Sequence, residues 1–240
     1  MSHLVLIRHG QSEWNAANRF NGWIDTQLSP TGIKQAQAAG QALKEEGLAF
    51  DAAYSSALSR TIMTIDEVLT TLGQLYVPQT KTWRLNERHY GSLQGENKDA
   101  MFAKYGHDQV QIWRRSYEIL PPKIHVFEPE VTIDGKRYPA FDRRYNKLKY
   151  GQLPVSENIQ STVKRVLPLW QKNIRPELEA GKNILIVAHG TSVRALTKII
   201  EGTAPADIVK LEIPNAEPIV YNFDNKLNIL NKKVLKQKSL

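Results

Sequence analysis

Two apolar runs, far apart in the chain, each end in a histidine followed by a glycine. Leu4–Ile7 leads into Arg8-His9-Gly10, and Ile184–Val187 leads into Ala188-His189-Gly190. Continuous aliphatic runs of this length are typical of strands buried on both faces of a parallel sheet. Ligands of open α/β sheets bind at the carboxyl ends of the strands. If the two strands are neighbours, His9 and His189 therefore meet at one pocket with Arg8 beside them.

Strands and helices alternate along most of the chain. Ser29-Pro30 is a helix start signal, and Gly47 and Gly73 are helix end signals. The alternation predicts an α/β fold of three layers, α/β/α, with a mostly parallel sheet. We expect helices at 30–46, 57–72, 156–178 (interrupted near Pro168) and 192–200, and further strands at 52–54 and 219–223.

The middle of the chain, from about 84 to 151, has a different character. It contains Pro121-Pro122 and a hairpin signal at Asp134-Gly135, and it shows no periodic core of its own. We interpret it as an insertion that covers the active site of a single domain spanning residues 1–240. The basic C-terminal segment, about 232–240, is expected to be a flexible tail.

The amino-acid composition excludes several kinds of site and disfavours some kinds of partner. The 240 residues include no cysteine, which excludes a disulfide framework, a thiol nucleophile and any cysteine-based metal site. No secretory signal or membrane-spanning stretch is visible, so we expect a cytoplasmic protein without a membrane partner. The net charge of +8 has three open explanations: a focused anion pocket, a generally basic surface, or nucleic acid. The last is disfavoured because the lysines and arginines are scattered and form no known motif.

The two His-Gly turns suit phosphoryl transfer. His9 is the candidate nucleophile, because a neutral imidazole attacks near pH 7 and phosphohistidine is labile enough to pass its phosphoryl group onward. His189 would hold the transferring oxygens. We expect Gly10 and Gly190 to let backbone N–H groups approach a phosphate closely.

Two arginines and a glutamate complete the catalytic prediction. Arg8 and Arg60 can each grip phosphate with two hydrogen bonds, and Arg60 lies in the first turn of an expected helix. Glu87 is the best candidate acid/base, and nearby anions would favour its protonated form. The alternatives are a solvated Arg60 and a Glu87 that forms a salt bridge with Arg84 or Arg88.

These residues resemble the cofactor-dependent phosphoglycerate mutases of the histidine phosphatase superfamily. Arg8-His9-Gly10 marks only the superfamily, whereas Glu87–Gly91 and Trp113–Ser116 are specific to the mutase branch. The likeness runs nearly end to end and also includes Ser12, Trp14-Asn15, Asn18–Phe20, Gly22-Trp23, Leu28-Ser29, Arg60, Asn97-Lys98, Glu157 and Ser192.

The resemblance implies interconversion of 3-phosphoglycerate and 2-phosphoglycerate in glycolysis and gluconeogenesis. It implies that 2,3-bisphosphoglycerate primes the enzyme by phosphorylating His9, that no metal is needed, and that the chain forms a homodimer or homotetramer. Arg8, Arg60, His189 and Asn15 would contact the transferring phosphoryl group, with Glu87 as acid/base. The carboxylate and the second phosphate of the substrate would be held by Tyr90, Lys98, Arg114 and Arg115.

Three departures from the family pattern concern the pocket. Asn21 precedes Gly22 where the family usually has threonine, and Thr191 follows Gly190 where it usually has asparagine. Because these exchanges are opposite, we hypothesise that the two side chains approach the same anion and exchange roles. The segment 126–136 is also longer than usual. The departures keep two alternatives open: a phosphatase of the same superfamily acting on small phosphate esters, and a non-catalytic anion-binding paralogue.

Overall fold

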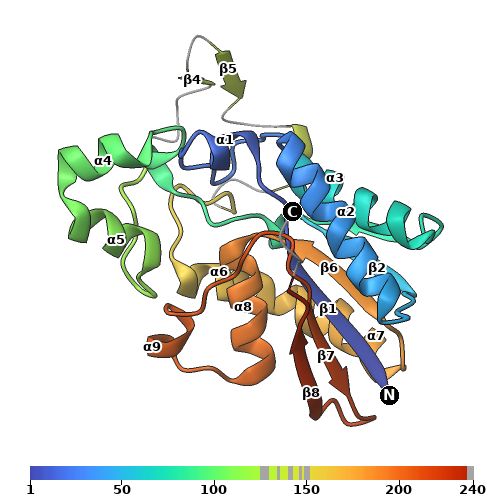
Figure 1. Ribbon diagram of the computed structural model, residues 1–240. Helices are drawn as coiled ribbons and strands as arrows, with labels where there is room; N and C mark the ends of the chain where they lie inside the picture. Colours follow the sequence, from blue (N-terminus) through green and yellow to red (C-terminus); the bar gives the residue numbers. More distant parts are fainter. Residues whose placement is uncertain (125–129, 134–135, 140–142, 146–147, 149–151, 237–240) are drawn as a thin grey trace.

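A six-stranded sheet lies at the centre of the structure, a computed structural model that describes residues 1–124, 130–133, 136–139, 143–145, 148 and 152–236 (Figure 1). Its strand order among these residues is β3-β2-β6-β1-β7-β8. Four strands are parallel: β1 (Ser2–Arg8), β2 (Ala52–Ser55), β3 (Gln79–Lys81) and β6 (Ile184–Ala188). β7 (Ile219–Phe223) pairs antiparallel with both β1 and β8 (Ile229–Val234). The mostly parallel sheet is confirmed.

Successive residues of β1 are buried on opposite faces of the sheet. Leu4 and Leu6 pack in one apolar cluster with α6 (Ile159–Leu169), α7 (Arg175–Glu179) and α8 (Gly190–Glu201). Val5 and Ile7 pack in another cluster with α2 (Pro30–Glu45) and α3 (Ser59–Leu72). Figure 1 shows these two helix groups on either side of the sheet. The three-layer prediction is therefore confirmed, and both faces of the central strands are covered.

Helix ends follow the predicted signals closely. The Ser29 hydroxyl accepts the N–H of Gly32 at 3.1 Å, Pro30 is the first residue of α2, and Gly47 follows its end with φ 68°. Gly73 ends α3 with φ 72°. α3 starts at Ser59, two residues later than expected, because the backbone of Leu58 is still extended. α8 starts two residues earlier than expected, directly after His189.

The helix expected to break near Pro168 continues through that residue. Proline at this position removes the hydrogen bond to the carbonyl of Lys164, an exposed residue, so water can satisfy that carbonyl. The irregularity comes later, as a π-helical turn over Trp170–Ile174 that leads into α7. Pro176 in the first turn of α7 is its natural cause, because its ring would clash with the carbonyl four residues earlier.

The middle segment has more structure than predicted. It contains the 3₁₀ turns η1 (Trp83–Leu85) and η2 (Gly91–Leu93) and the helices α4 (Lys98–Tyr105) and α5 (His107–Arg115). The expectation that it lacks a core is wrong, because a small apolar cluster joins it to the N-terminal region. The buried members of that cluster are Phe20, Leu93, Met101 and Val110.

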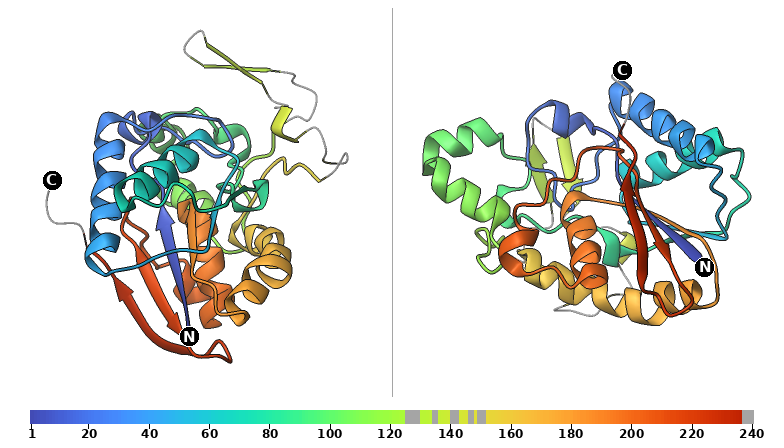
Figure 2. Two further views of the ribbon diagram at one scale, coloured as in Figure 1. Left: turned by 90° about the vertical axis from the view of Figure 1, so that its right-hand side faces the viewer. Right: turned by 60° about the horizontal axis from the view of Figure 1, so that its bottom comes forward.

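The predicted hairpin forms between β4 (Glu130–Ile133) and β5 (Lys136–Pro139), which pair antiparallel. Its turn, Asp134-Gly135, lies outside the described residues, as do parts of the long segment 126–136. The hairpin projects from the rest of the molecule (Figure 2). Beyond it, the short turn η3 (Arg143–Tyr145) returns to the body, where Arg144 donates to the Asp25 carboxylate at 2.7 Å.

The C-terminal segment departs from the prediction of a flexible tail from residue 232. Lys232, Lys233 and Val234 belong to β8 and pair with β7, and the N–H of Leu235 donates to the carbonyl of Pro218 at 2.9 Å. Every residue of β8 is exposed, so its sequence lacks the apolar alternation that would have indicated a strand. Residues 237–240 lie outside the described part.

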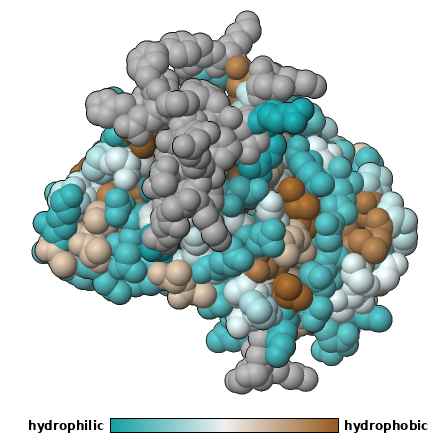
Figure 3. All heavy atoms as spheres, turned by 90° about the horizontal axis from the view of Figure 1, so that it is seen from above, coloured by the Kyte–Doolittle hydropathy of each residue, from teal (hydrophilic) through white to brown (hydrophobic). Residues whose placement is uncertain are grey.

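Two short helices, α1 (Glu13–Ala16) and α9 (Pro205–Ile208), complete the fold. Seen from above, the described surface is largely hydrophilic, with apolar residues in small separate patches (Figure 3). None of the helices within the described residues is both long and apolar enough to cross a membrane.

Candidate active site

The pairing of β1 with β6 brings the two histidines together. Leu4 lies opposite Ile184, and the same offset of 180 residues runs along both strands to Arg8 and Ala188. The N–H of His9 continues this ladder by donating to the carbonyl of Ala188 at 2.9 Å. The rings of His9 and His189 lie 4.9 Å apart at 64°. The central spatial prediction is therefore confirmed.

The hydrogen bonding of His9 leaves one ring nitrogen as a base. Its Nδ1 lies 2.6 Å from the carbonyl oxygen of Gly10. A carbonyl only accepts, so Nδ1 carries the proton and Nε2 keeps its lone pair. Burial, with Arg60 and Arg8 nearby, lowers the pKa of His9 well below 6.5. His9 is thus a neutral imidazole with Nε2 free for nucleophilic attack.

His189 lies fully buried behind His9, and its orientation follows from a chain of hydroxyl groups. Thr61 donates to the carbonyl of Leu58 at 2.8 Å, so the Ser56 hydroxyl donates to Thr61 at 2.6 Å. The remaining contact, 2.8 Å between Ser56 Oγ and His189 Nε2, therefore has Nε2–H as its donor. Burial, Arg60 and His9 lower the pKa of His189 well below 6.5, and its Nδ1 lacks a partner among the described residues.

A cavity of about 120 Å³ opens in front of His9 and is lined mainly by cations. Arg60 comes from the first turn of α3, as predicted, but it is buried rather than solvated, and it donates to the carbonyls of Ile24 and Gly22 at 2.9 and 2.8 Å. Arg8 donates to the carbonyl of Ile213 at 2.8 Å. Burial lowers the pKa of Arg60 to about 10, so both guanidinium groups stay charged at neutral pH.

Both of these arginines keep an unsatisfied donor. The Nε atoms of Arg8 and Arg60 are buried without a hydrogen-bond partner in the described part of the chain. Unpaired buried donors are costly, and an anion in the cavity would satisfy them. This feature fits the residues to a phosphate ligand.

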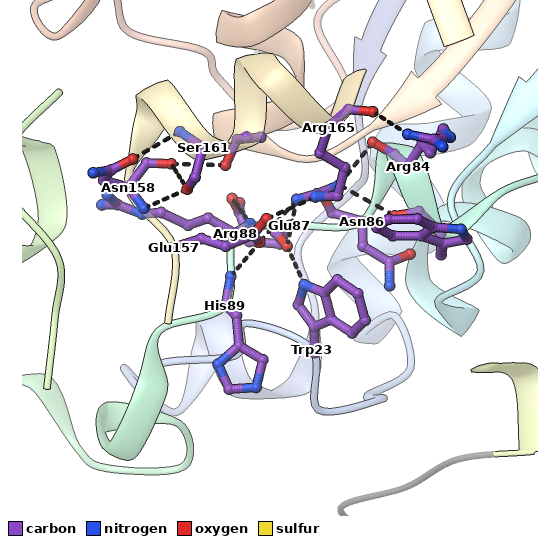
Figure 4. A network of polar contacts seen from close by, with 12 residues as sticks. Trp23, Arg84, Asn86, Glu87, Arg88, His89, Glu157, Asn158, Ser161 and Arg165 are labelled. Atoms are coloured by element: carbon purple, nitrogen blue, oxygen red, sulfur yellow. Dashed lines mark hydrogen bonds and ion pairs between the residues drawn. The ribbon is translucent and has the colours of Figure 1, made fainter. Parts of the chain in front are cut away.

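Glu87 lies at the start of α8. One of its carboxylate oxygens accepts the N–H of Arg88 at 2.8 Å and that of Thr191 at 3.2 Å. The alternative, a salt bridge to Arg84 or Arg88, is not formed: Arg84 instead donates to the carbonyl of Arg165. The segment that carries Glu87 is held from behind by the buried ion pair of Arg165 and Glu157 (Figure 4).

The two glycines that follow the histidines have different roles. A Cβ at Gly10 would lie 2.3 Å from the carbonyl oxygen of Gly32, and the N–H of Gly10 donates to Thr64. The expectation that Gly10 serves phosphate approach is therefore wrong, because it serves strand–helix packing. A Cβ at Gly190 would meet no atom closer than 3.6 Å, and its neighbours there are Arg194, Glu87 and Arg8. Gly190 thus does open onto the site, at the N-terminus of α8.

Asn15, Asn21 and Thr191 all line the cavity. The amide oxygen of Asn15 accepts the N–H of Ser12, which leaves its NH₂ group for a ligand. The Asn21 amide bridges Ser12 and Thr26, donating to the first at 3.0 Å and accepting from the second at 3.0 Å. The proposed exchange of roles between Asn21 and Thr191 remains a prediction.

Gly22 has φ 56°, a conformation that favours glycine, and lies against Gln94.

The second cationic group lies on the middle segment. Tyr90, Lys98, Arg114 and Arg115 all line the cavity, and burial with Arg114 and Arg8 lowers the pKa of Lys98 to about 8. Arg115 pairs with Glu212 at 3.0 Å. Four further residues line the cavity that were not predicted as site residues: Arg19, Phe20, Arg194 and Glu212. Arg194 lies four residues after Gly190. Residues at this spacing share one face of a helix, so the sequence alone could have placed Arg194 beside Gly190.

The cavity accounts for most of the excess positive charge. Seven lysines and arginines line it against two carboxylates, a surplus of five out of the net +8 of the chain. A focused anion pocket therefore explains the composition better than a generally basic surface. Within the described residues, no group of three or more His, Asp or Glu side chains is placed to hold a metal.

The chain belongs to the histidine phosphatase superfamily (branch 1), whose family pattern matches residues 4–133 and 128–234. Among its relatives, a protein of Lactobacillus acidophilus named 2,3-bisphosphoglycerate-dependent phosphoglycerate mutase is 52% identical, covering 98% of this chain and 99% of the relative. A protein of the same name from Mannheimia succiniciproducens is 50% identical, with coverage of 97% and 99%. The resemblance to the mutase branch is confirmed.

Solved structures share the fold. A mycobacterial glucosyl-3-phosphoglycerate phosphatase has a TM-score of 0.69 at 23% identity and covers 99% of both chains. The alpha-ribazole phosphatase from Shigella flexneri has a TM-score of 0.70 at 19% identity, with coverage of 98% and 96%. At this level of identity the likeness concerns the fold alone.

Alanine substitutions at the two glycines separate packing from ligand binding. Gly10→Ala should lower the free energy of unfolding by about 1–3 kcal/mol, because its methyl group overlaps a backbone carbonyl. Gly190→Ala should leave stability unchanged and weaken the binding of inorganic phosphate about tenfold, because its methyl group enters the site. Urea unfolding and phosphate titration measure the two effects. Equal destabilisation by both changes would contradict this assignment.

Three buried histidines make stability depend on pH. Burial lowers the pKa of His89 to about 3, and those of His9 and His189 also lie well below 6.5. Below pH 6.5 the unfolded chain therefore binds protons that the folded, ligand-free chain does not. The free energy of unfolding should fall as pH drops from 6.5, with a slope approaching about 4 kcal/mol per pH unit, at about 1.4 for each histidine. Urea unfolding in phosphate-free buffer at several pH values measures this slope, and His9→Gln should reduce it by about a third. A stability that is flat down to about pH 5.5 would exclude neutral buried histidines.

Proposed function

We propose that the chain is a 2,3-bisphosphoglycerate-dependent phosphoglycerate mutase that interconverts 3-phosphoglycerate and 2-phosphoglycerate through a phosphohistidine at His9. The observation that carries the proposal is a neutral His9 with a free Nε2 facing a cavity with five excess positive charges. Two phosphate monoesters and a carboxylate bear about four to five negative charges at neutral pH, which matches this surplus. The names of the relatives agree.

The catalytic group consists of residues already placed around His9. The bisphosphate primer, when bound, supplies the phosphoryl group. Nε2 of His9 attacks the phosphorus while the Gly10 carbonyl holds the Nδ1 proton. Arg8 and Arg60 stabilise the charge on the transferring oxygens, the N-terminus of α8 opens onto the cavity at Gly190, and His189 packs against the ring of His9.

We assign to Glu87 the transfer of a proton to and from the glycerate hydroxyl. A glycerate hydroxyl leaves as a poor alkoxide unless it is protonated, and the same hydroxyl must lose its proton when it attacks phosphohistidine. Glu87 lines the cavity, and one of its carboxylate oxygens accepts the N–H groups of Arg88 and Thr191. We assign it the roles of acid in one half-reaction and base in the other.

The second cationic group suits a mutase better than a phosphatase. A phosphatase releases its alcohol after one transfer, whereas a mutase holds the bisphosphate intermediate while it reorients. Lys98, Arg114 and Arg115 provide a second anion site in the same cavity, together with Tyr90. A phosphatase acting on small phosphate esters is the second candidate, since Arg8, His9, Arg60 and His189 alone would support it.

The proposal includes a reaction without metal, a cytoplasmic location where glycolytic phosphoglycerates occur, and assembly into a homodimer or homotetramer. It includes neither a nucleic-acid nor a membrane partner. These parts are supported by the mutase assignment rather than by a separate observation.

The primer and the nucleophile can be tested together. With 3-phosphoglycerate as substrate, catalytic amounts of 2,3-bisphosphoglycerate should stimulate formation of 2-phosphoglycerate, chelators should have no effect, and little inorganic phosphate should appear. His9→Ala should abolish both the activity and the acid-labile incorporation of phosphate. Phosphate as the main product would favour the phosphatase, binding without turnover would favour the paralogue, and undiminished labelling of the variant would exclude His9.

A double-mutant cycle tests the exchange of Asn21 and Thr191. If both side chains serve one anion, Asn21→Thr and Thr191→Asn should each lower kcat/KM, and the double variant should recover part of that loss. We expect a coupling free energy of about 0.5–3 kcal/mol, as found for residues that share a partner. Additive effects in the steady-state assay would refute the shared anion.

A further inference from the structure

We propose that Arg165, on α6, is a positioning residue for Glu87. Arg165 does not line the cavity; its effect on the reaction would pass entirely through the backbone that carries the acid/base. The inference rests on the proposed function in assigning proton transfer to Glu87. Arg165 was not among the residues that the sequence indicated.

The guanidinium of Arg165 binds the Glu87 segment at several points. Its NH1 donates to the carbonyls of Trp83 and Arg84 at 3.1 and 2.7 Å. Its NH2 faces the carbonyls of Asn86 and Glu87 at 3.2 and 3.4 Å. Four of the five carbonyls from 83 to 87 therefore converge on one side chain; Figure 4 shows Arg165 against this segment.

Glu157 holds this guanidinium in place and also forms hydrogen bonds to the backbone beyond Glu87. Its two carboxylate oxygens accept from Nε and NH2 of Arg165 at 2.8 and 3.0 Å. The same carboxylate accepts the N–H of His89 at 2.9 Å, and the N–H of Glu157 donates to the His89 carbonyl at 2.8 Å. The ion pair thus contacts the backbone on both sides of Glu87.

Other contacts also order this segment, but those of Leu85 and Asn86 hold side chains, whereas Arg165 holds backbone carbonyls. Leu85 packs in a core cluster, and the Asn86 side chain accepts the N–H of Ala57 and donates to the Tyr145 hydroxyl. Its own backbone supplies only the 3₁₀ turn η1, and Glu87 itself lies beyond that turn. On the other side, the indole of Trp23 donates to the Glu87 carbonyl at 2.7 Å. Removing the forked guanidinium would leave four carbonyls of this loop without that donor, so the backbone that carries the Glu87 carboxylate would be held less firmly.

Stability alone does not account for the pair. Both side chains are about 4% exposed, and a buried ion pair gains little stability over well-packed apolar residues of similar size. What an apolar pair cannot do is bind four carbonyls in one geometry. A displacement of about 1 Å in a catalytic group can cost about 100-fold in rate, which is the scale of the expected effect.

Arg165→Lys keeps the positive charge beside Glu157 but loses the fork. It should slow phosphoryl transfer from 2,3-bisphosphoglycerate to His9 by about 10- to 100-fold, because that leaving group needs the proton of Glu87. Transfer from p-nitrophenyl phosphate should be unchanged, because nitrophenolate leaves without a proton. The KM for 3-phosphoglycerate should also be unchanged. Rapid-quench measurement of phosphohistidine formation gives both rates.

Three further variants make the test decisive. Glu87→Gln shows how the two transfer rates change when the acid is lost: transfer from 2,3-bisphosphoglycerate should slow, and transfer from p-nitrophenyl phosphate should not. Val166→Ala changes a buried apolar neighbour in α6 whose side chain can make no hydrogen bond to the segment; it is the control for destabilisation and should slow neither substrate selectively. If Arg165→Lys fails to fold, Glu157→Gln, which weakens the hold on Arg165, should show the same selectivity to a smaller degree.

The outcomes separate the two proposals. If Glu87→Gln is selective and the Arg165 and Glu157 variants slow both substrates equally, or neither, Arg165 is merely structural and the inference is overturned while the proposed function stands. If Glu87→Gln itself shows no dependence on the leaving group, the acid/base assignment fails and the inference fails with it.

Discussion

The site depends on one parallel strand pairing. β1 and β6 are hydrogen-bonded with a constant offset of 180 residues, so the residues that follow each strand lie at the same level. A slip of one residue would turn Leu4 and Leu6 to the opposite face and separate the two imidazoles. Register is therefore held by burial on both faces, through α6 and α8 on one side and α2 and α3 on the other. The core that stabilises the fold also sets the distance between the rings.

Concentrating cations in a small cavity is costly, and the structure shows how they are held. Arg8, Arg60 and Arg194 donate to backbone carbonyls, those of Ile213, Gly22, Ile24 and Leu211. A carbonyl oxygen orients a guanidinium without cancelling its charge, whereas a carboxylate would do both. Within the described residues, Glu212 at the edge of the cavity is the carboxylate that pairs with a lining arginine, Arg115. The cavity thus keeps its field for an anionic ligand.

The sequence allowed prediction of what depends on local pattern. The alternation of strands and helices indicated the three layers. Ser29 and Gly73 indicated helix ends, and the two His-Gly turns indicated the pair of histidines. The predictions that failed concern features that depend on contacts between distant segments of the chain. The need for glycine at Gly10 comes from Gly32, and β8 forms by pairing with β7 rather than from its own pattern. Arg165 reads in sequence as one more helical arginine, and only its burial against the segment 83–87 distinguishes it.

Glu87 connects the two parts of the molecule that the reaction requires. The His9 side of the cavity rests on the sheet, which is rigid because its strands are buried on both faces. The substrate-holding side rests on the middle segment, whose helices α4 and α5 pack on a small apolar cluster that includes Phe20 of the N-terminal region. Glu87 lies between them, with its carboxylate at the start of α8 and its backbone bound to α6 through Arg165. Because α6 and α8 pack directly on the sheet, the acid/base is fixed to the same framework as His9.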